Sequence, residues 1–217
     1  MSSTCLIIGN KKYSSWSLRP WLFARYFNIP FEEIRLSLYV PSFYTQILQY
    51  SPSGRVPVLH DAGRIIWDSL AICEYLNETH LAGKGLPSDG DARAVARSVS
   101  AEMHAGFAEL RKELPLNCAY DKGAVSISDS AQQEVHRICE IWRTCRMKYG
   151  QNGHFLFGDF SIADAMYAPV VLRFASYAVK LETIEQTYLE TILALPALQA
   201  WISAGKAETE VLLSQER

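Results

Sequence analysis

The hydrophobic pattern of this 217-residue chain changes near Leu81, and that change constrains the fold more than any other feature. Before it, short strand-like runs alternate with helical stretches, whereas after it long amphipathic helices follow one another almost without strand signals. The pattern therefore predicts two domains, an α/β domain over residues 1–81 and an all-helical domain over residues 91–217. The aperiodic segment 82–90, which contains three glycines and a proline, is the expected linker.

Six elements are expected in the first domain, in the order strand, helix, strand, strand, strand, helix, with an unassigned segment after the second strand. A short apolar run, alternating residues and a hairpin-like turn at residues 61–63 predict the strands. The strands are expected over residues 5–9, 31–38, 56–60 and 64–67, and the helices over residues 16–27 and 70–77.

Apolar residues recur at helical spacing along two segments of the second domain. They are Val95, Val99, Met103, Gly106, Leu110 and Leu114, and then Val135, Ile138, Trp142 and Cys145. Ser161 and Asp164 have the spacing of a capping box, with Phe160 as the hydrophobic lead-in, so a helix is expected to begin there. We assign Asp164 to folding rather than to catalysis. Pro169 is expected to kink this helix, and Pro196 to open a last short one.

Composition and charge exclude several classes of function. Hydrophobic residues make up 49% of the chain and its net charge is −2, so a packed core is expected and nucleic acid is not an expected partner. No apolar run reaches the ~18 residues of a membrane span, and the N-terminal apolar stretch is too short for a secretory signal, so we expect a cytosolic location and no membrane partner. The five cysteines form no metal-ligand pattern and are expected to be reduced thiols.

Three serines gather where the first strand leads into the first helix. They lie in the run Tyr-Ser-Ser-Trp-Ser-Leu-Arg over residues 13–19, as Ser14, Ser15 and Ser17. Free backbone N–H groups and the positive end of a helix dipole favour an anion, such as a thiolate, and a serine hydroxyl adds an adjustable donor. Simple capping of the helix by one of these serines is the alternative, and it stays open at this point.

Two dipeptides downstream also indicate a binding site. A proline that begins a strand, as in Val56-Pro57, is tolerated at an edge or with a cis bond, and it can leave the Val56 backbone free for a peptide-like ligand. Asp68-Ser69 opens a helix, where a carboxylate, a hydroxyl and backbone N–H groups can hold a zwitterionic amino-acid head. An ordinary edge strand and ordinary N-capping are the respective alternatives.

Together these features resemble the cytosolic glutathione transferase superfamily over essentially the whole chain. The run Ser-Ser-Trp-Ser-Leu-Arg over residues 14–19 is most similar to its serine-type, zeta-like branch, whose pattern is Ser-Ser-Cys-Ser-x-Arg. The resemblance implies a thioredoxin-like first domain, a cis bond before Pro57, and glutathione as co-substrate without a metal. Trp16 stands where that branch has cysteine, which weakens the case for its maleylacetoacetate isomerase activity.

The resemblance also implies roles for individual residues. Ser14 is expected to donate its hydroxyl hydrogen to the glutathione sulfur, with Ser15 as the second candidate. The expected glutathione-binding residues are Ser14, Arg55, Val56, Pro57, Asp68 and Ser69. Val56 would pair with the cysteinyl backbone, Asp68 and Ser69 would bind the γ-glutamyl head, and Arg55 would reach the glycyl carboxylate.

A second substrate, a small hydrophobic electrophile, is expected between the domains. Trp16 lies at the mouth of the serine run, and His104, Phe107 and Arg111 have a spacing that would place them on one helical face. The alternative is that Phe107 belongs to the core and that His104 and Arg111 are solvated. The resemblance implies a homodimeric transferase with a role in detoxification, while a glutathione-dependent isomerase and a noncatalytic binding protein stay as alternatives.

Overall fold

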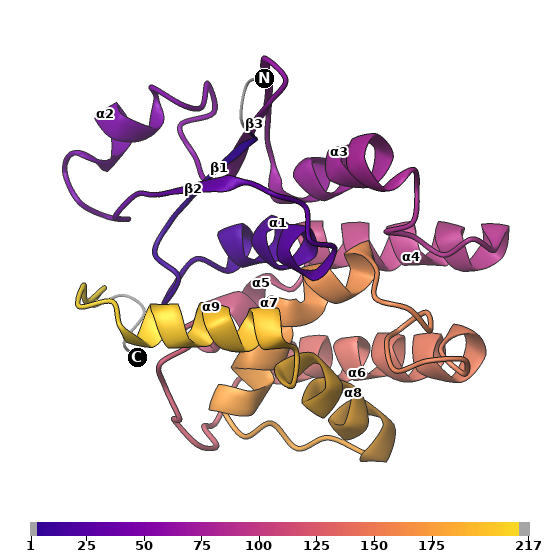
Figure 1. Cartoon of the computed structure of the whole chain (residues 1–217). Coiled ribbons are helices and arrows are strands. Elements are labelled where there is room, and N and C mark those ends of the chain that lie inside the picture. Colours follow the sequence, from indigo (N-terminus) through magenta and orange to yellow (C-terminus); the bar gives the residue numbers. More distant parts are fainter. Residues whose placement is uncertain (1–3, 213–217) are drawn as a thin grey trace.

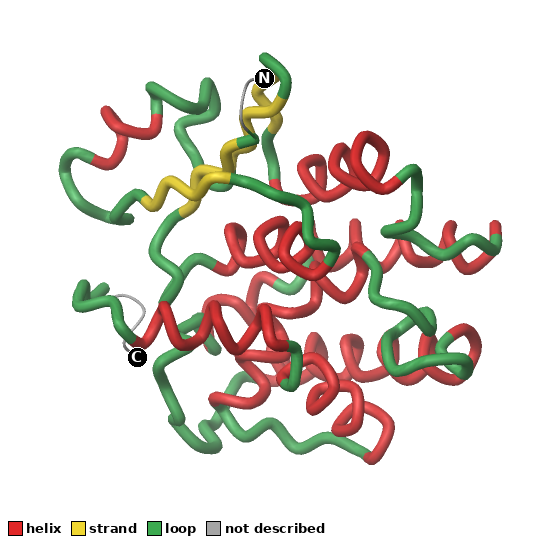
Figure 2. The backbone as a smooth tube through the Cα atoms, viewed as in Figure 1, coloured by secondary structure: helices red, strands yellow, loops and turns green. Residues whose placement is uncertain are grey.

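The computed structural model describes residues 4–212. A small sheet lies at one end of the molecule, and helices make up the rest (Figure 1). Figure 2 shows the strands confined to that end, with long loops leading from them into the helices.

A four-stranded sheet with the order β2-β1-β3-β4 organises the N-terminal part. β1 runs parallel to β2 because helix α1 forms the crossover between them, whereas β3 is antiparallel to both β1 and β4. Helix α2 fills the segment that the sequence left unassigned, so the expected element order is confirmed, although each strand is shorter than expected. The elements are β1 (Cys5–Ile8), α1 (Ser15–Tyr26), β2 (Glu32–Arg35), α2 (Phe43–Ile47), β3 (Val58–Asp61), β4 (Arg64–Ile66) and α3 (Ser69–Leu81).

The two faces of the sheet have different partners. Leu6 and Ile8 of β1 belong to the main core, which includes α1 and α3, while Ile7 packs in a separate small cluster with Val58 and with Ile47 of α2. Successive side chains of a strand point to opposite faces, so α2 covers the face that α1 and α3 leave open (Figure 1).

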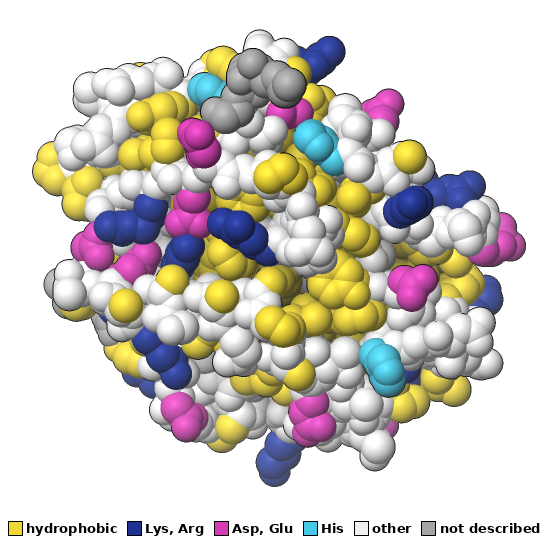
Figure 3. Space-filling model, in the orientation of Figure 1, with side chains coloured by type: hydrophobic (Ala, Val, Ile, Leu, Met, Phe, Trp, Pro, Cys, Tyr) yellow, Lys and Arg dark blue, Asp and Glu magenta, His cyan; other side chains and the backbone are white. Residues whose placement is uncertain are grey.

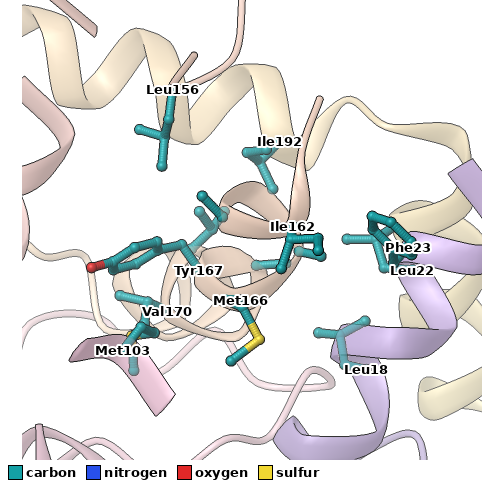
Figure 4. Close-up of a cluster of buried hydrophobic side chains, with 14 of the residues drawn as sticks. Leu18, Leu22, Phe23, Met103, Leu156, Ile162, Met166, Tyr167, Val170 and Ile192 are labelled. Carbon is teal, nitrogen blue, oxygen red and sulfur yellow. The ribbon is translucent and has the colours of Figure 1, made fainter. Parts of the chain in front are cut away.

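Helices follow without a further strand element in the described part of the chain. Helix α7 lies at the centre of the helical part, as the burial of all but its last two residues shows. Figure 4 shows Leu18, Leu22 and Phe23 of α1 facing Ile162 and Met166 of α7, so the two parts of the chain share one core. The helices are α4 (Gly90–Ala105), α5 (Ala108–Glu113), α6 (Asp129–Tyr149), α7 (Ile162–Ser176), α8 (Thr183–Leu193) and α9 (Pro196–Lys206).

The apolar spacing from Val95 to Leu114 predicted one continuous helix, and this prediction is wrong. Helix α4 ends at Ala105 and α5 begins at Ala108, because Gly106 is extended and Phe107 has a φ of +62°. A Cβ at Gly106 would lie 2.9 Å from the carbonyl oxygen of Glu102. The chain therefore turns between the two apolar stretches, although both still face the core.

The capping box at the start of α7 is confirmed. The Asp164 carboxylate accepts hydrogen bonds from the Ser161 backbone and hydroxyl, both 2.8 Å, from the Leu156 backbone at 3.1 Å and from the Tyr188 hydroxyl at 3.1 Å. Burial raises the pKa of Asp164 to about 6, against the lowering effect of these hydrogen bonds. Helix α9 begins at Pro196 as expected, and α7 continues through Pro169, where the kink stays a prediction.

Charged side chains gather where the sheet meets α9 (Figure 3). Arg35 pairs with Glu210 at 2.8 Å, and the Glu208 carboxylate accepts the backbone N–H groups of Lys11 and Lys12 at 2.8 and 3.0 Å. This contact, the Glu208 clamp, ties the segment after α9 to the loop that leads from β1 to the serine run.

The five cysteines are free thiols, three of them buried, and burial raises the pKa of every one of them. A raised thiol pKa keeps the sulfur protonated and unreactive, which fits a packing role. Between residues 4 and 212 no helix is both long and apolar enough to cross a bilayer.

Candidate functional site

Two adjoining cavities lie between the N-terminal sheet domain and the helices. The serine cavity, about 480 Å³, contains Ser14 and Ser15, and the aspartate cavity, about 420 Å³, contains Asp68 and Ser69. Three residues line both of them: Trp16, Arg55 and Val56. A long ligand that passes Val56 would therefore occupy both cavities at once.

The serine run forms the entry to α1. Ser14 caps the helix by accepting the Ser17 backbone N–H at 3.3 Å, so the capping alternative holds for this residue. Its hydroxyl also donates to the Ser17 Oγ at 2.8 Å, which in turn accepts the Gly9 N–H at 3.1 Å. The Ser15 hydroxyl makes no hydrogen bond within residues 4–212 and lines the serine cavity, so it is available to a ligand.

Val56 precedes β3 at the boundary between the cavities. The Val56–Pro57 peptide bond is cis, as the resemblance implied, and Pro57 lines the aspartate cavity. β3 begins only at Val58, and the Val56 backbone forms no hydrogen bond with any other described residue. A peptide-like ligand could therefore pair with it as an added strand.

Asp68 and Ser69 meet in the aspartate cavity at the start of α3. One carboxylate oxygen of Asp68 caps the helix at the Leu70 N–H, 3.1 Å away, and the other lies 3.0 Å from His104 Nε2. The Ser69 hydroxyl is buried, 1% exposed, and has no partner among the described residues. A buried hydroxyl without a partner is rare, and here it faces a cavity, which indicates a ligand site.

The three residues expected on one helical face, His104, Phe107 and Arg111, do not share one, because the chain turns at Gly106. Arg111 lines the serine cavity, whereas His104 lines the aspartate cavity and pairs with Asp68. Phe107 is buried in the main core, as its alternative interpretation had it. Trp16 lines both cavities and is 36% exposed.

Three arginines without ion pairs make the inner wall of the serine cavity positive. Arg111 and Arg173 line it, and Arg19 lies beneath Trp16; none of them has a carboxylate within 4.0 Å among residues 4–212. Burial lowers the pKa of Arg19 and of Arg173 to about 9. Buried cations that lack a counterion are costly, so an anionic ligand is expected in this cavity.

The sequence interpretation missed Arg173 and the aromatic residues Tyr39 and Tyr44, which also line the serine cavity. Arg173 had a signal, since it is the one charged residue after Asp164 in the otherwise apolar α7. No group of three His, Cys, Asp or Glu side chains that could hold a metal ion occurs in the described part of the chain.

Comparison with known protein families gives two matches, which together cover most of the chain. Residues 13–79 match the glutathione S-transferase N-terminal domain, and residues 93–204 match the glutathione S-transferase C-terminal domain. The chain belongs to the glutathione S-transferase family. The predicted fold class is thereby confirmed: a thioredoxin-like α/β domain is followed by an all-helical one.

Two curated relatives of this glutathione S-transferase illustrate the range of the family. It is 28% identical to a probable maleylacetoacetate isomerase of Caenorhabditis elegans over 158 residues, 72% of each chain. It is 26% identical to a glutathione S-transferase 2 of Manduca sexta over 211 residues, 88% of this chain and 92% of the relative.

Solved structures agree on the fold of this glutathione S-transferase. A Burkholderia glutathione transferase homologue with bound glutathione superimposes with a TM-score of 0.73 at 21% identity, covering 95% of this chain and all of the other. A bacterial maleyl pyruvate isomerase of the zeta class gives 0.72 at 19% identity, with the same coverage. The protein is an enzyme of a family that uses glutathione as co-substrate, and transferase and isomerase chemistry both fit.

Proposed function

We propose that this glutathione S-transferase is of the serine type, holds glutathione across the two cavities, and delivers its thiolate to an anionic electrophile in the serine cavity. The observation that carries the proposal is that the two cavities meet at Val56, whose backbone is unpaired. A tripeptide bound there would have its head in one cavity and its thiol in the other.

The γ-glutamyl head fits the aspartate cavity. Its ammonium would face the Asp68 carboxylate, and its carboxylate would accept the Ser69 hydroxyl and the N-terminal N–H groups of α3. The partnerless Ser69 hydroxyl supports this arrangement. Arg55 is exposed and lines both cavities, so its guanidinium is suited to the glycyl carboxylate.

The thiol requires activation, since a free thiol has a pKa of about 8.5 and is mostly protonated at neutral pH. Ser14 is the proposed donor. In the structure the Ser14 hydroxyl donates to the Ser17 Oγ, which also accepts the Gly9 N–H. When the sulfur binds, the Ser14 hydrogen would turn from Ser17 to the sulfur, and the Ser17 hydroxyl would donate to Ser14 in its place. Ser15, whose hydroxyl is free in the serine cavity, is the second candidate.

The second substrate is proposed to carry a carboxylate. Arg111 and Arg173 line the serine cavity with no carboxylate within 4.0 Å among residues 4–212, and the aromatic rings of Tyr39 and Tyr44 supply an apolar wall. This combination favours the alternative of a glutathione-dependent isomerase, in which the thiolate adds to a cis double bond and leaves after rotation about the resulting single bond. The same site would serve conjugation when the adduct is released.

The test combines calorimetric titration of glutathione with thiolate absorbance of the complex from about pH 5 to about pH 9. Loss of one hydrogen bond to the charged sulfur is expected to raise the thiol pKa by about one to two units in Ser14→Ala. Ser100→Ala, which removes a buried serine outside both cavities, is the control. A rise in Ser15→Ala alone would move the role to Ser15, and no rise in either would refute serine activation.

The homodimer and the role in detoxification that the resemblance implies stay predictions, as does the cytosolic location expected from the apolar runs. Analytical ultracentrifugation at several concentrations tests the first: a species of about twice 24.4 kDa is expected, and a monomer at every concentration would contradict it.

A further inference from the structure

We propose that Trp16 determines the charge preference for the second substrate, by holding Arg111 in the wall of the serine cavity and by narrowing the passage from that wall to the aspartate cavity. The inference rests on the proposed function. It also concerns the position at which the serine run departs from the pattern that it resembles, where a small thiol is replaced by a large indole.

Trp16 lies where the two cavities meet. It is in the first turn of α1, directly after Ser15, and its side chain lines both cavities while 64% of its surface is covered. Arg55 and Val56 line both cavities from the strand side, so the indole forms the opposite side of the passage. A residue with a small side chain at this position would widen the passage between the two cavities.

Two guanidinium groups lie against the indole. The Arg19 guanidinium carbon lies 4.3 Å from the ring centroid and that of Arg111 lies 4.7 Å from it. The His104 ring meets the indole edge-on, with centroids 5.3 Å apart. Neither arginine has an ion pair within 4.0 Å among the described residues, so the π face of the indole is a close electrostatic partner of both charges.

Arg111 is thereby fixed from two sides. Its Nη2 donates to the carbonyl oxygens of Met103 and His104 at the end of α4, and its other flank rests against the indole. Its Nε is buried and has no partner among residues 4–212. A guanidinium with unused donors, held at a cavity wall, binds a carboxylate well, because little side-chain freedom is lost on binding.

The chemistry suited to a test is addition of glutathione to an enone, in two forms that differ only in charge. In β-acetylacrylate and in its methyl ester, the thiolate sulfur forms a bond to carbon while the π electrons take up a proton from water. The loss of enone absorbance measures the rate of both reactions. Only the acid carries a carboxylate for Arg111, so the ratio of the two KM values reports the interaction.

In Trp16→Ala, the KM for β-acetylacrylate is expected to rise roughly 5- to 30-fold, which corresponds to about 1–2 kcal/mol. The KM for the methyl ester is expected to change less than about threefold. Trp16→Phe keeps a ring against Arg111 and is expected to retain much of the preference for the acid. Trp67→Ala removes an indole that lines only the aspartate cavity, so it is expected to change the KM for glutathione and to leave the acid-to-ester ratio intact.

The outcomes separate the two proposals. Absence of glutathione binding by the wild-type protein would refute the proposed function itself. Glutathione binding and turnover by the wild type, with equal changes for acid and ester in Trp16→Ala, would leave that function standing and overturn the role of Trp16. Circular dichroism and thermal melting of each variant verify that the fold is intact.

Discussion

Replacing Asp164 by alanine is expected to lower the free energy of unfolding by about 4 kcal/mol. This value follows from the number of hydrogen bonds that the carboxylate accepts. The carboxylate accepts four hydrogen bonds in a buried site, from a backbone N–H and a hydroxyl of Ser161, from the Leu156 N–H and from the Tyr188 hydroxyl. Each is worth about 1 kcal/mol net, and donors left unpaired in the core raise the cost further. A loss of this size is a large part of the total stability of 5–15 kcal/mol that is typical of folded proteins.

Urea denaturation followed by tryptophan fluorescence measures this loss as a lower midpoint at an unchanged slope. Asp159→Ala is the matched control, because Asp159 is exposed five residues earlier and is expected to change stability by less than about 0.5 kcal/mol. Glutathione turnover per folded molecule should be unchanged in Asp164→Ala. Retained stability together with lost turnover would refute the folding role and make Asp164 a functional residue.

Two further predictions concern the glutathione site. Arg55→Glu reverses the charge at the boundary of the cavities, so we expect glutathione to bind at least about tenfold more weakly in calorimetry, and unchanged affinity would remove Arg55 from the site. Ser69→Ala should weaken the binding of glutathione by about 1 kcal/mol. The binding of a thiol without the γ-glutamyl head should be unaffected. An equal loss in Ser100→Ala, outside the cavities, would show that the effect is not local.

Local patterns in the sequence predicted most of the fold. The helix starts at Ser161 and at Pro196 depend on neighbouring residues and on backbone hydrogen bonds, so they can be predicted without tertiary information. The cis bond before Pro57 came from the resemblance, since the local conflict alone left several solutions open. Each strand was predicted to be longer than it is, because pairing along the sheet, rather than apolar character, determines where a strand begins and stops.

The serine and aspartate parts of the candidate site could be predicted from the sequence, but the placement of the side chains that the helical domain contributes to it could not. Periodicity carried a helix through Gly106, because the two apolar stretches stay in phase although the backbone turns between them. His104 therefore pairs with Asp68 instead of sharing a face with Arg111. Arg173 enters the cavity from α7, distant in sequence, and only tertiary packing brings it there.

The Glu208 clamp affects the order in which this protein can fold during its synthesis. The backbone N–H groups of Lys11 and Lys12, three and two residues before Ser14, find their acceptor 197 and 196 residues later in the chain. During synthesis, domains near the N-terminus begin to fold first, but these two hydrogen bonds beside the proposed thiol site cannot form until residue 208 has left the ribosome. A chain released before that point would therefore lack this tie between the loop and the segment after α9.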